Sequence, residues 1–420
     1  MDNHVALTPL ENKNPSFFYG YIIVVAAFLI MVLMWGTSFS FGVFFKPLLD
    51  EFGWTRAMTS GAFSLSLVLL SLFGVVAGKL TDMFGPRIVV TVCGLFLGLG
   101  YLLMSQVNTI WQLYLFYGVI IGLGMSTAFV PLVSTVARWF VKRRGMMTGF
   151  AAAGLSIGTL IMPPVANWLI SIYGWRTSFM IVGIIALVLI ILAAQFLKRD
   201  PGQIGQSPYG GDEFQTRNDV RVSGLSLREA FHTQQFWFLG VAVLCFTLGL
   251  GTISVHIVPH AVGLGISPGN AAIILAFIGG TGTGGRVIMG SACDRTSYKF
   301  VLIICFALLS VSFFWLLSAE ELWMLYLCAA IFGFGYGGIS AAISPTVAEL
   351  FKLSSHGAIL GVINIFGEGG SALGSVVAGY IFDATSRYQV AFLVCATTSI
   401  IGIILILLLR PIRKYVGANP

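Results

Sequence analysis

The sequence predicts an all-α membrane protein whose twelve transmembrane helices form two pseudo-symmetric halves of six. Three observations carry this prediction. Hydrophobic residues make up 57% of the 420 residues and charged residues only 9%, where soluble domains carry about 25%. Twelve apolar segments each reach the roughly 20 residues that a helix needs to span a bilayer. Motifs of the first half also recur, in the same order, in the second half.

The twelve segments fall into two groups of six, separated by one long polar stretch rich in Gly, Pro and charged residues. We therefore expect an N-terminal six-helix half at 1–197, a linker at 198–235 and a C-terminal six-helix half at 236–420. The first segment is too long for a signal-peptide h-region and follows no basic n-region, so we expect a retained transmembrane helix. The expected helices are 19–45, 56–80, 86–106, 110–137, 145–169, 175–197, 236–262, 268–292, 298–318, 322–347, 357–382 and 388–410.

The basic residues predict the orientation of these helices. Of the 23 Lys and Arg, eighteen fall in loops on the side of the N-terminus and four on the other side. The positive-inside rule then places both termini and the linker in the cytoplasm. We expect the protein to lie in the cell's inner (plasma) membrane. Because the positive charge is spread over short loops, we expect no nucleic-acid partner. Arg286 alone belongs to neither side.

The repeat is clearest at two motifs. The stretch "GKLTDMFGPR" (78–87) matches "GSACDRTSYK" (290–299), with Gly and Asp at the same offset. The stretch "ARWFVKRRGMMTG" (137–149) corresponds to "AELFKLSSHGAILG" (348–361). Parallel six-helix repeats around an axis through the membrane are typical of transporters, with the substrate between the halves near the midplane.

The first of these motifs resembles the G-x-L-x-D-x-x-G-x-R signature of the major facilitator superfamily. Gly78, Leu80, Asp82, Gly85 and Arg87 fit this signature. The resemblance implies the superfamily's fold, and it implies that the loop braces the cytoplasmic gate. The expected gating residues are Asp82, Arg87 and Asp294.

A narrower resemblance concerns "ARWFVKRRGMMTGFAAAGLSIGTLIMPP", "YGWRTSF" and the arginine of the eighth helix. These resemble the monocarboxylate transporter family and its bacterial relatives, including oxalate–formate exchangers. The resemblance implies that Arg286 binds the substrate carboxylate. The animal members have an Asp and a Lys where this chain has Gly282 and Phe39. Proton handling by those two groups therefore does not carry over.

Arg286 also stands out on physical grounds. It precedes Asp294 by eight residues, which places it about 12 Å from the cytoplasmic end of the helix. A charged side chain at the bilayer centre raises the free energy of membrane insertion by roughly 2.5–3.5 kcal/mol. Its planar guanidinium matches a carboxylate with two hydrogen bonds. The alternative is an ion pair with a carboxylate of the eleventh helix. The glycines around it leave room for a substrate or let helices pack closely: Gly279, Gly280, Gly282, Gly284 and Gly285.

Other polar residues inside the spans are candidates for proton coupling or for orienting the substrate. Glu368 in the eleventh helix, and His256 and His260 in the seventh, are the candidate proton acceptors. The alternative is that each of these three residues forms structural hydrogen bonds and has no role in transport. Tyr117, Tyr336 and Asn364 are candidate substrate ligands, although buried tyrosines often serve packing alone.

Several functions are disfavoured. Two G-x-G-x-x-G matches lie inside apolar spans rather than between a strand and a helix, so we expect no nucleotide. The six cysteines lack metal-ligand spacing, and no nucleophile elbow or P-loop occurs, so we expect no metal, no cofactor and no enzyme.

The sequence predicts a proton-coupled symporter for a small monocarboxylate of the lactate or pyruvate type. Its partners are then the anion, the proton and the lipid bilayer, and we expect a monomer. One alternative is an exchanger of organic anions, of the oxalate–formate or dicarboxylate type, which favours two cationic clamps. Another is a membrane sensor that binds a ligand without transport. A drug–proton antiporter is disfavoured because "GLSIGTLIMPPVANW" departs from the antiporter pattern in the fifth helix.

Overall fold

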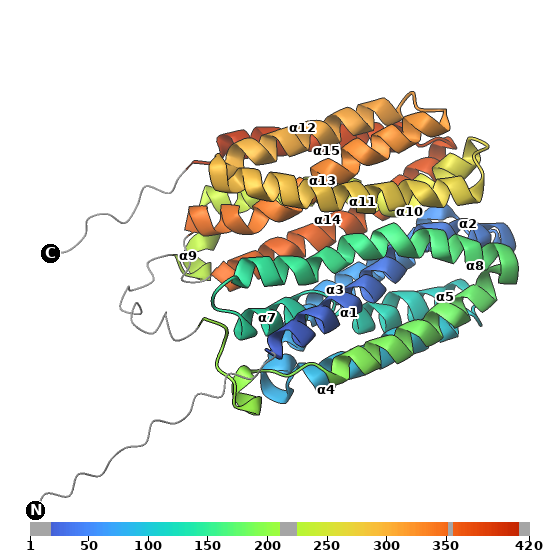
Figure 1. The fold of residues 1–420 in the computed structure, drawn as a ribbon. Helices are drawn as coiled ribbons and strands as arrows, with labels where there is room; N and C mark the ends of the chain where they lie inside the picture. Colours follow the sequence, from blue (N-terminus) through green and yellow to red (C-terminus); the bar gives the residue numbers. More distant parts are fainter. Residues whose placement is uncertain (1–17, 211–224, 352–355, 411–420) are drawn as a thin grey trace, which may run out of the picture.

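The computed structural model describes residues 18–210, 225–351 and 356–410, which form a bundle of long helices (Figure 1). Eleven of them are long and apolar enough to cross a membrane, and no strand occurs within these ranges. The all-α membrane fold is therefore confirmed. The first part of the chain forms α1 Gly20–Phe39, α2 Phe41–Phe52, α3 Arg56–Phe84, α4 Pro86–Met104, α5 Ile110–Leu113, the π-helix η1 Tyr114–Ile121, α6 Gly122–Met125, α7 Val130–Trp139 and α8 Arg144–Gln195. The second part forms the 3₁₀ helix η2 Pro201–Ile204, α9 Leu227–Phe231, α10 Gln234–Gly263, α11 Pro268–Arg295, α12 Tyr298–Leu316, α13 Leu322–Phe351, α14 His356–Thr385 and α15 Gln389–Leu408.

The count of eleven agrees with the expected twelve because α8 contains two of the expected helices. It runs for 52 residues, but Gly174 within it has φ 75° and ψ 163°. This backbone conformation is open to glycine and costly for other residues. Gly174 therefore separates the expected helices 145–169 and 175–197.

Two other expected helices are interrupted in the structure. The first continues past residue 45, because α2 follows α1 after Ser40 and extends to Phe52. The fourth contains the π-helical segment η1, and a turn at 126–129 ends it before α7. Pro131 lies in the first turn of α7, where its missing N–H group is tolerated.

Each half has its own hydrophobic core. One cluster of buried side chains comes almost entirely from α1–α8, and the other from α9–α15. Between the halves, α3 packs against α14, α8 against α11, and α2 against α10 (Figure 1). These helix pairs form a seam between two separately packed units.

The two ends of this seam differ. We call the end where η2 and α9 lie the linker end (Figure 1). At the opposite end, the Asp383 carboxylate accepts hydrogen bonds from the backbone N–H groups of Arg56 at 3.0 Å and Ala57 at 2.8 Å. The Ser64 hydroxyl on α3 donates to the carbonyl of Ala372 on α14 at 2.7 Å. These bonds close the opposite end of the seam.

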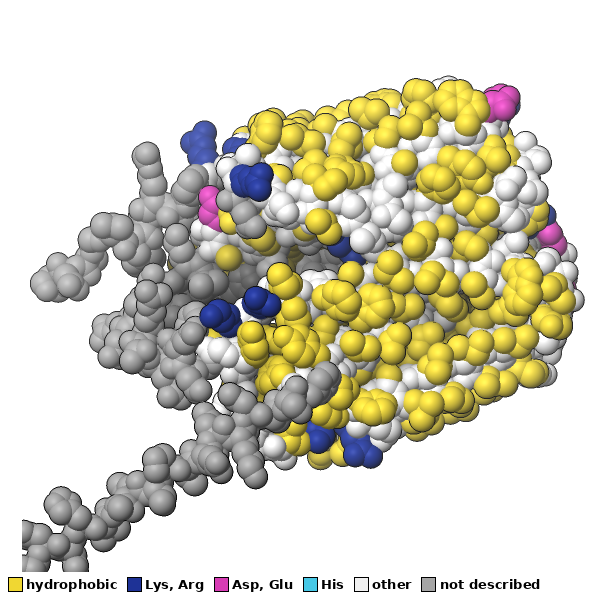
Figure 2. Space-filling view, viewed as in Figure 1, with side chains coloured by type: hydrophobic (Ala, Val, Ile, Leu, Met, Phe, Trp, Pro, Cys, Tyr) yellow, Lys and Arg dark blue, Asp and Glu magenta, His cyan; other side chains and the backbone are white. Residues whose placement is uncertain are grey.

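The hydrogen bonds that join described residues of the two halves run from the opposite end to the level of Arg286. Figure 2 shows the surface hollowed between the halves on the side of the linker end. The seam is therefore bonded at the opposite end and hollowed at the linker end.

Candidate functional site

Arg286 lies at the centre of the seam and contacts both halves. Its Nη1 donates to the Ser156 hydroxyl at 2.8 Å and to the Ala152 carbonyl at 3.3 Å, both on α8. Its Nη2 donates to the Tyr336 hydroxyl on α13 at 3.1 Å. The guanidinium carbon also lies 5.4 Å from the centre of the Tyr336 ring. The structure thus brings together two of the predicted ligands, Arg286 and Tyr336.

The charge of Arg286 is not neutralised within the described part of the chain. No carboxylate there lies within 4.0 Å of its guanidinium, so the alternative ion pair with a carboxylate of the eleventh helix is absent from the described residues. A guanidinium has five N–H groups, and the three bonds to these described partners leave two for a further acceptor. The arrangement can therefore bind an anion without displacing a counter-ion.

Close helix packing, one of the two roles that the sequence left open for the glycines around Arg286, is seen at two of them, and room for a substrate stays a prediction. A Cβ atom at Gly279 would lie 2.6 Å from the Leu160 backbone nitrogen, so this glycine permits the close approach of α11 and α8. At Gly285 it would lie 2.2 Å from the carbonyl oxygen of Phe334 on α13. At Gly284, by contrast, no atom would lie within 4 Å. Close helix packing explains two of these glycines, and open space adjoins the third.

Glu368 and Asn364 lie on α14, and both are half-buried. Neither forms a hydrogen bond or an ion pair with another described residue. A half-buried carboxyl without a cationic partner is suited to exchanging a proton. Their roles in proton coupling and substrate binding stay predictions.

Tyr117 does not join the Arg286 cluster in this conformation. Its side chain is 1% exposed and packs in the core of the first half, with ring centres 4.4 Å from Phe41 and 6.3 Å from Tyr101. Its hydroxyl has no hydrogen-bond partner among the described atoms. The π-helical segment η1 carries this residue, and such segments are frequent at functional sites. Its predicted role as a ligand remains a prediction.

His256 belongs to a hydrogen-bonded chain at the opposite end. Arg56 donates to the Tyr388 hydroxyl, which lies 3.0 Å from His256 Nδ1. His256 Nε2 lies 2.8 Å from the Ser375 carbonyl oxygen, which only accepts, so in the neutral imidazole Nε2 carries the proton and Nδ1 accepts from Tyr388. His260 Nε2, in contrast, is buried without a partner among the described residues. The contacts of His256 match its structural alternative, and proton acceptance by either histidine stays a prediction.

The predicted gating residues lie at the linker end. Asp82, at the end of α3, forms an ion pair with Arg138 of α7. Arg87 Nε donates to the Gln195 side-chain oxygen at the end of α8, at 2.8 Å. The backbone of Asp294 belongs to α11, but its side chain lies outside the described part. Asp82 and Arg87 thus tie together helices of the first half, and their gating role remains a prediction.

Ser156 is a side-chain contact of Arg286 that the sequence alone does not indicate. It is fully buried on α8 and accepts the shortest hydrogen bond from Arg286. It lies within the "GFAAAGLSIG" part of a stretch quoted above for its family resemblance. A lone serine among small residues carries no chemical signal of its own, so only the position of α8 beside α11 reveals it. The described residues contain no group of three or more His, Cys, Asp or Glu placed to hold a metal.

Comparison with known proteins gives consistent similarities. The family model of the Major Facilitator Superfamily matches residues 26–300 and 285–420. Monocarboxylate transporter 7 of Homo sapiens is 26% identical over 94% of this chain and 87% of its own length. Monocarboxylate transporter 4 of Rattus norvegicus is 28% identical over 95% of this chain and 85% of its own length.

Among solved structures, a bacterial homologue of the human lysosomal transporter Spinster, in an inward-facing and unoccupied conformation, has a TM-score of 0.72. It is 16% identical, and the match covers 93% of this chain and 96% of that one. At this identity the likeness concerns the fold alone.

Proposed function

Since the chain belongs to the major facilitator superfamily, we propose that it is a secondary active transporter for a small monocarboxylate of the lactate or pyruvate type, coupled to a proton. The curated relatives described above are monocarboxylate transporters by name. The observation that carries the proposal is Arg286, whose charge stands at the seam without a carboxylate partner among the described residues.

Arg286 is the anion clamp in this proposal. Its present partners are neutral oxygens of Ser156, Ala152 and Tyr336. A carboxylate carries a negative charge and can accept two parallel hydrogen bonds from a guanidinium, so an incoming carboxylate competes well with these neutral oxygens. The Tyr336 hydroxyl, which accepts from Arg286, keeps its own proton to donate to the substrate. A single clamp suits one carboxylate better than two.

Glu368 is the first candidate for the coupled proton. It lies on α14, which packs against α3 of the other half along the same seam as the clamp. Moving one net charge through the membrane potential changes the free energy by about 2.3 kcal/mol per 100 mV. An anion that moves together with a proton carries no net charge, so the proton gradient then drives uptake and the potential does not. His256 and His260 are the other candidates.

Alternating access requires the seam to open at one end while it closes at the other. We place the linker end in the cytoplasm, as the distribution of Lys and Arg indicates, with both termini on that side. The structure then corresponds to a conformation open to the cytoplasm. Opening to the outside requires the bonds of Asp383 and Ser64 across the seam to break.

The test is uptake of labelled L-lactate into proteoliposomes, with and without an inward acid gradient and with the membrane potential clamped. We expect the acid gradient to accelerate uptake. We expect clamping the membrane potential to leave the rate of uptake unchanged. In Arg286→Ala we expect uptake to fall by about a hundred-fold, because a buried carboxylate that loses its charged partner loses about 3 kcal/mol. Arg228→Ala is the matched control, since Arg228 is exposed on α9.

Other outcomes separate the alternatives. Uptake that appears only in vesicles loaded with oxalate or malate would establish an exchanger in place of a symporter. Lactate binding without uptake or counterflow would establish a sensor. Equal uptake by Arg286→Ala and Arg228→Ala would overturn the proposal that Arg286 binds the substrate anion.

A further inference from the structure

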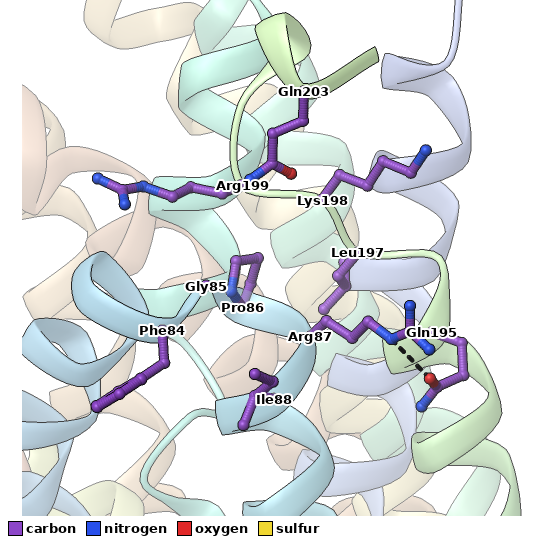
Figure 3. Close-up of a pocket in the computed structure, with 10 residues that line it drawn as sticks. All are labelled: Phe84, Gly85, Pro86, Arg87, Ile88, Gln195, Leu197, Lys198, Arg199 and Gln203. Atoms are coloured by element: carbon purple, nitrogen blue, oxygen red, sulfur yellow. Dashed lines mark hydrogen bonds between the residues drawn. The ribbon is translucent and has the colours of Figure 1, made fainter.

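A second polar site lies at the linker end, away from Arg286. A pocket of about 290 Å³ forms where the turn between α3 and α4 meets the chain that leaves α8 (Figure 3). Ten residues line it, and none of them is acidic. Three are cations: Arg87, Lys198 and Arg199. The pocket is therefore a recess that is open to solvent on one side and is lined by several positive charges.

Most of this charge is not neutralised. Arg87 donates to the neutral amide of Gln195 at 2.8 Å, and the Lys198 ammonium lies 4.7 Å from the centre of the Tyr19 ring. Neither cation has a carboxylate within 4.0 Å among the described residues, whereas Arg199 lies 3.2 Å from its neighbour Asp200. Figure 3 shows Arg87 and Lys198 extending to the same side. Two of the cations that line this pocket are therefore not neutralised by described residues.

The backbone adds to this field. Helix α4 begins at Pro86, and its N-cap residue, Gly85, provides no side-chain cap. The first N–H groups of a 19-residue helix are then without intrahelical acceptors and carry partial positive charge. Arg87 and Ile88, in this first turn, line the pocket. The backbone and the side chains thus favour the same kind of ligand.

Two of the side chains that line the pocket are large, apolar and exposed. Phe84 is 58% exposed and Ile88 56% exposed, at the end of one membrane-spanning helix and the start of the next. Exposed apolar side chains at this level contact acyl chains, while Lys and Arg beside them contact headgroups. A small soluble anion would use only the cations. A ligand with a negative head and apolar tails would use both features.

We infer that this pocket binds the phosphate of an anionic phospholipid at the linker-end surface of the membrane, with Arg87 and Lys198 as its cationic ligands. The phosphate also occurs free in solution, so the test must separate the two sources. A bound headgroup would link the α3–α4 turn to the chain after α8, within the first half of the protein.

The experiment is native mass spectrometry of the full chain in detergent, titrated separately with phosphatidylglycerol, phosphatidylcholine and inorganic phosphate. We expect phosphatidylglycerol to bind at least five-fold more tightly than phosphatidylcholine. Each cation near an anionic lipid surface contributes enough for about a five-fold change in affinity. Lys198→Gln should therefore weaken phosphatidylglycerol binding about five-fold, and Arg87→Gln with Lys198→Gln about 25-fold. Arg228→Gln, an exposed cation outside the pocket, should bind as the parent does.

Displacement of phosphatidylglycerol by millimolar inorganic phosphate would support a shared phosphate site. Equal binding of the two lipids, or equal binding by Lys198→Gln and Arg228→Gln, would overturn the inference. So would inorganic phosphate binding that depends on Lys198 while phosphatidylglycerol binding does not. The melting temperature in phosphatidylcholine nanodiscs should be the same for Lys198→Gln and the parent, which separates lost binding from misfolding.

Discussion

Asp383→Asn should shift the protein toward the state that is open at the end opposite the linker. The Asp383 carboxylate accepts two backbone hydrogen bonds across the seam, from Arg56 at 3.0 Å and Ala57 at 2.8 Å. Bonds to a charged group contribute about 1.5–3 kcal/mol each, but Asp383 is exposed and solvent reduces this to about 1 kcal/mol each. The carboxylate also neutralises partial charge at the start of α3.

Asparagine keeps one acceptor oxygen and loses the charge, so we expect a net change of about 1–2 kcal/mol. This corresponds to a shift of roughly five- to thirty-fold in the ratio of the two conformations. The shift is measured from the distance between spin labels at the linker end, on Met146→Cys of α8 and Ser291→Cys of α11, which are both exposed. The six native cysteines are buried, which limits background labelling. The short-distance population should grow in Asp383→Asn.

Asp50→Asn is the control. Asp50 lies near the same end of the bundle and pairs with Lys46 at 2.7 Å, but both residues belong to α2 and the pair does not cross the seam. It should leave the distance distribution unchanged. An unchanged distribution in Asp383→Asn, or the same shift in both variants, would refute the reasoning that Asp383 holds the seam closed.

Two further predictions concern stability. Gly279→Ala should lower the free energy of unfolding by about 1–3 kcal/mol, because its Cβ would lie 2.6 Å from the Leu160 backbone, whereas Gly284→Ala meets no atom; equal melting temperatures would contradict this. Hydrogen bonds from Ser226 hold the pKa of Glu229 below its ordinary value. The lowered pKa stabilises α9, and this stabilisation is fully present at pH values above the ordinary pKa of Glu. It is lost as the pH falls through the lowered pKa of Glu229. Amide exchange in α9, corrected for intrinsic rates, should rise in that range and stay flat in Glu229→Gln.

Much of the fold follows from local patterns in the sequence. Span length, apolar composition and the repeated motifs are properties of single segments, and they predicted the membrane helices. Gly174 and the turn before Pro131 show the limits of that approach. At Gly174 two expected helices follow each other with almost no loop between them. At 126–129 a turn interrupts a segment that is apolar throughout. Neither feature changes the hydropathy of the segment.

The candidate site was predictable only in part. A lone cation in an apolar span is a strong signal, which is why Arg286 was found from the sequence. Tyr336 and Ser156 reach it because three helices meet at one height, and no single-segment pattern encodes that meeting. Tyr117 looked equivalent to Tyr336 in sequence, yet it lies in the core of its own half. The contacts of His256 likewise come from α14 and from the residue before α15, and no pattern within α10 encodes them.

The two separate hydrophobic cores have a consequence for turnover. A conformational change that moves the halves as units exposes none of the apolar surface that folding buried within each half. The work of one cycle then falls on the contacts across the seam, a small set of hydrogen bonds and close helix approaches. Stability and turnover rate are therefore set by different residues. A substitution inside either core should change the stability against unfolding. A substitution on the seam should change the rate at which the two conformations interconvert.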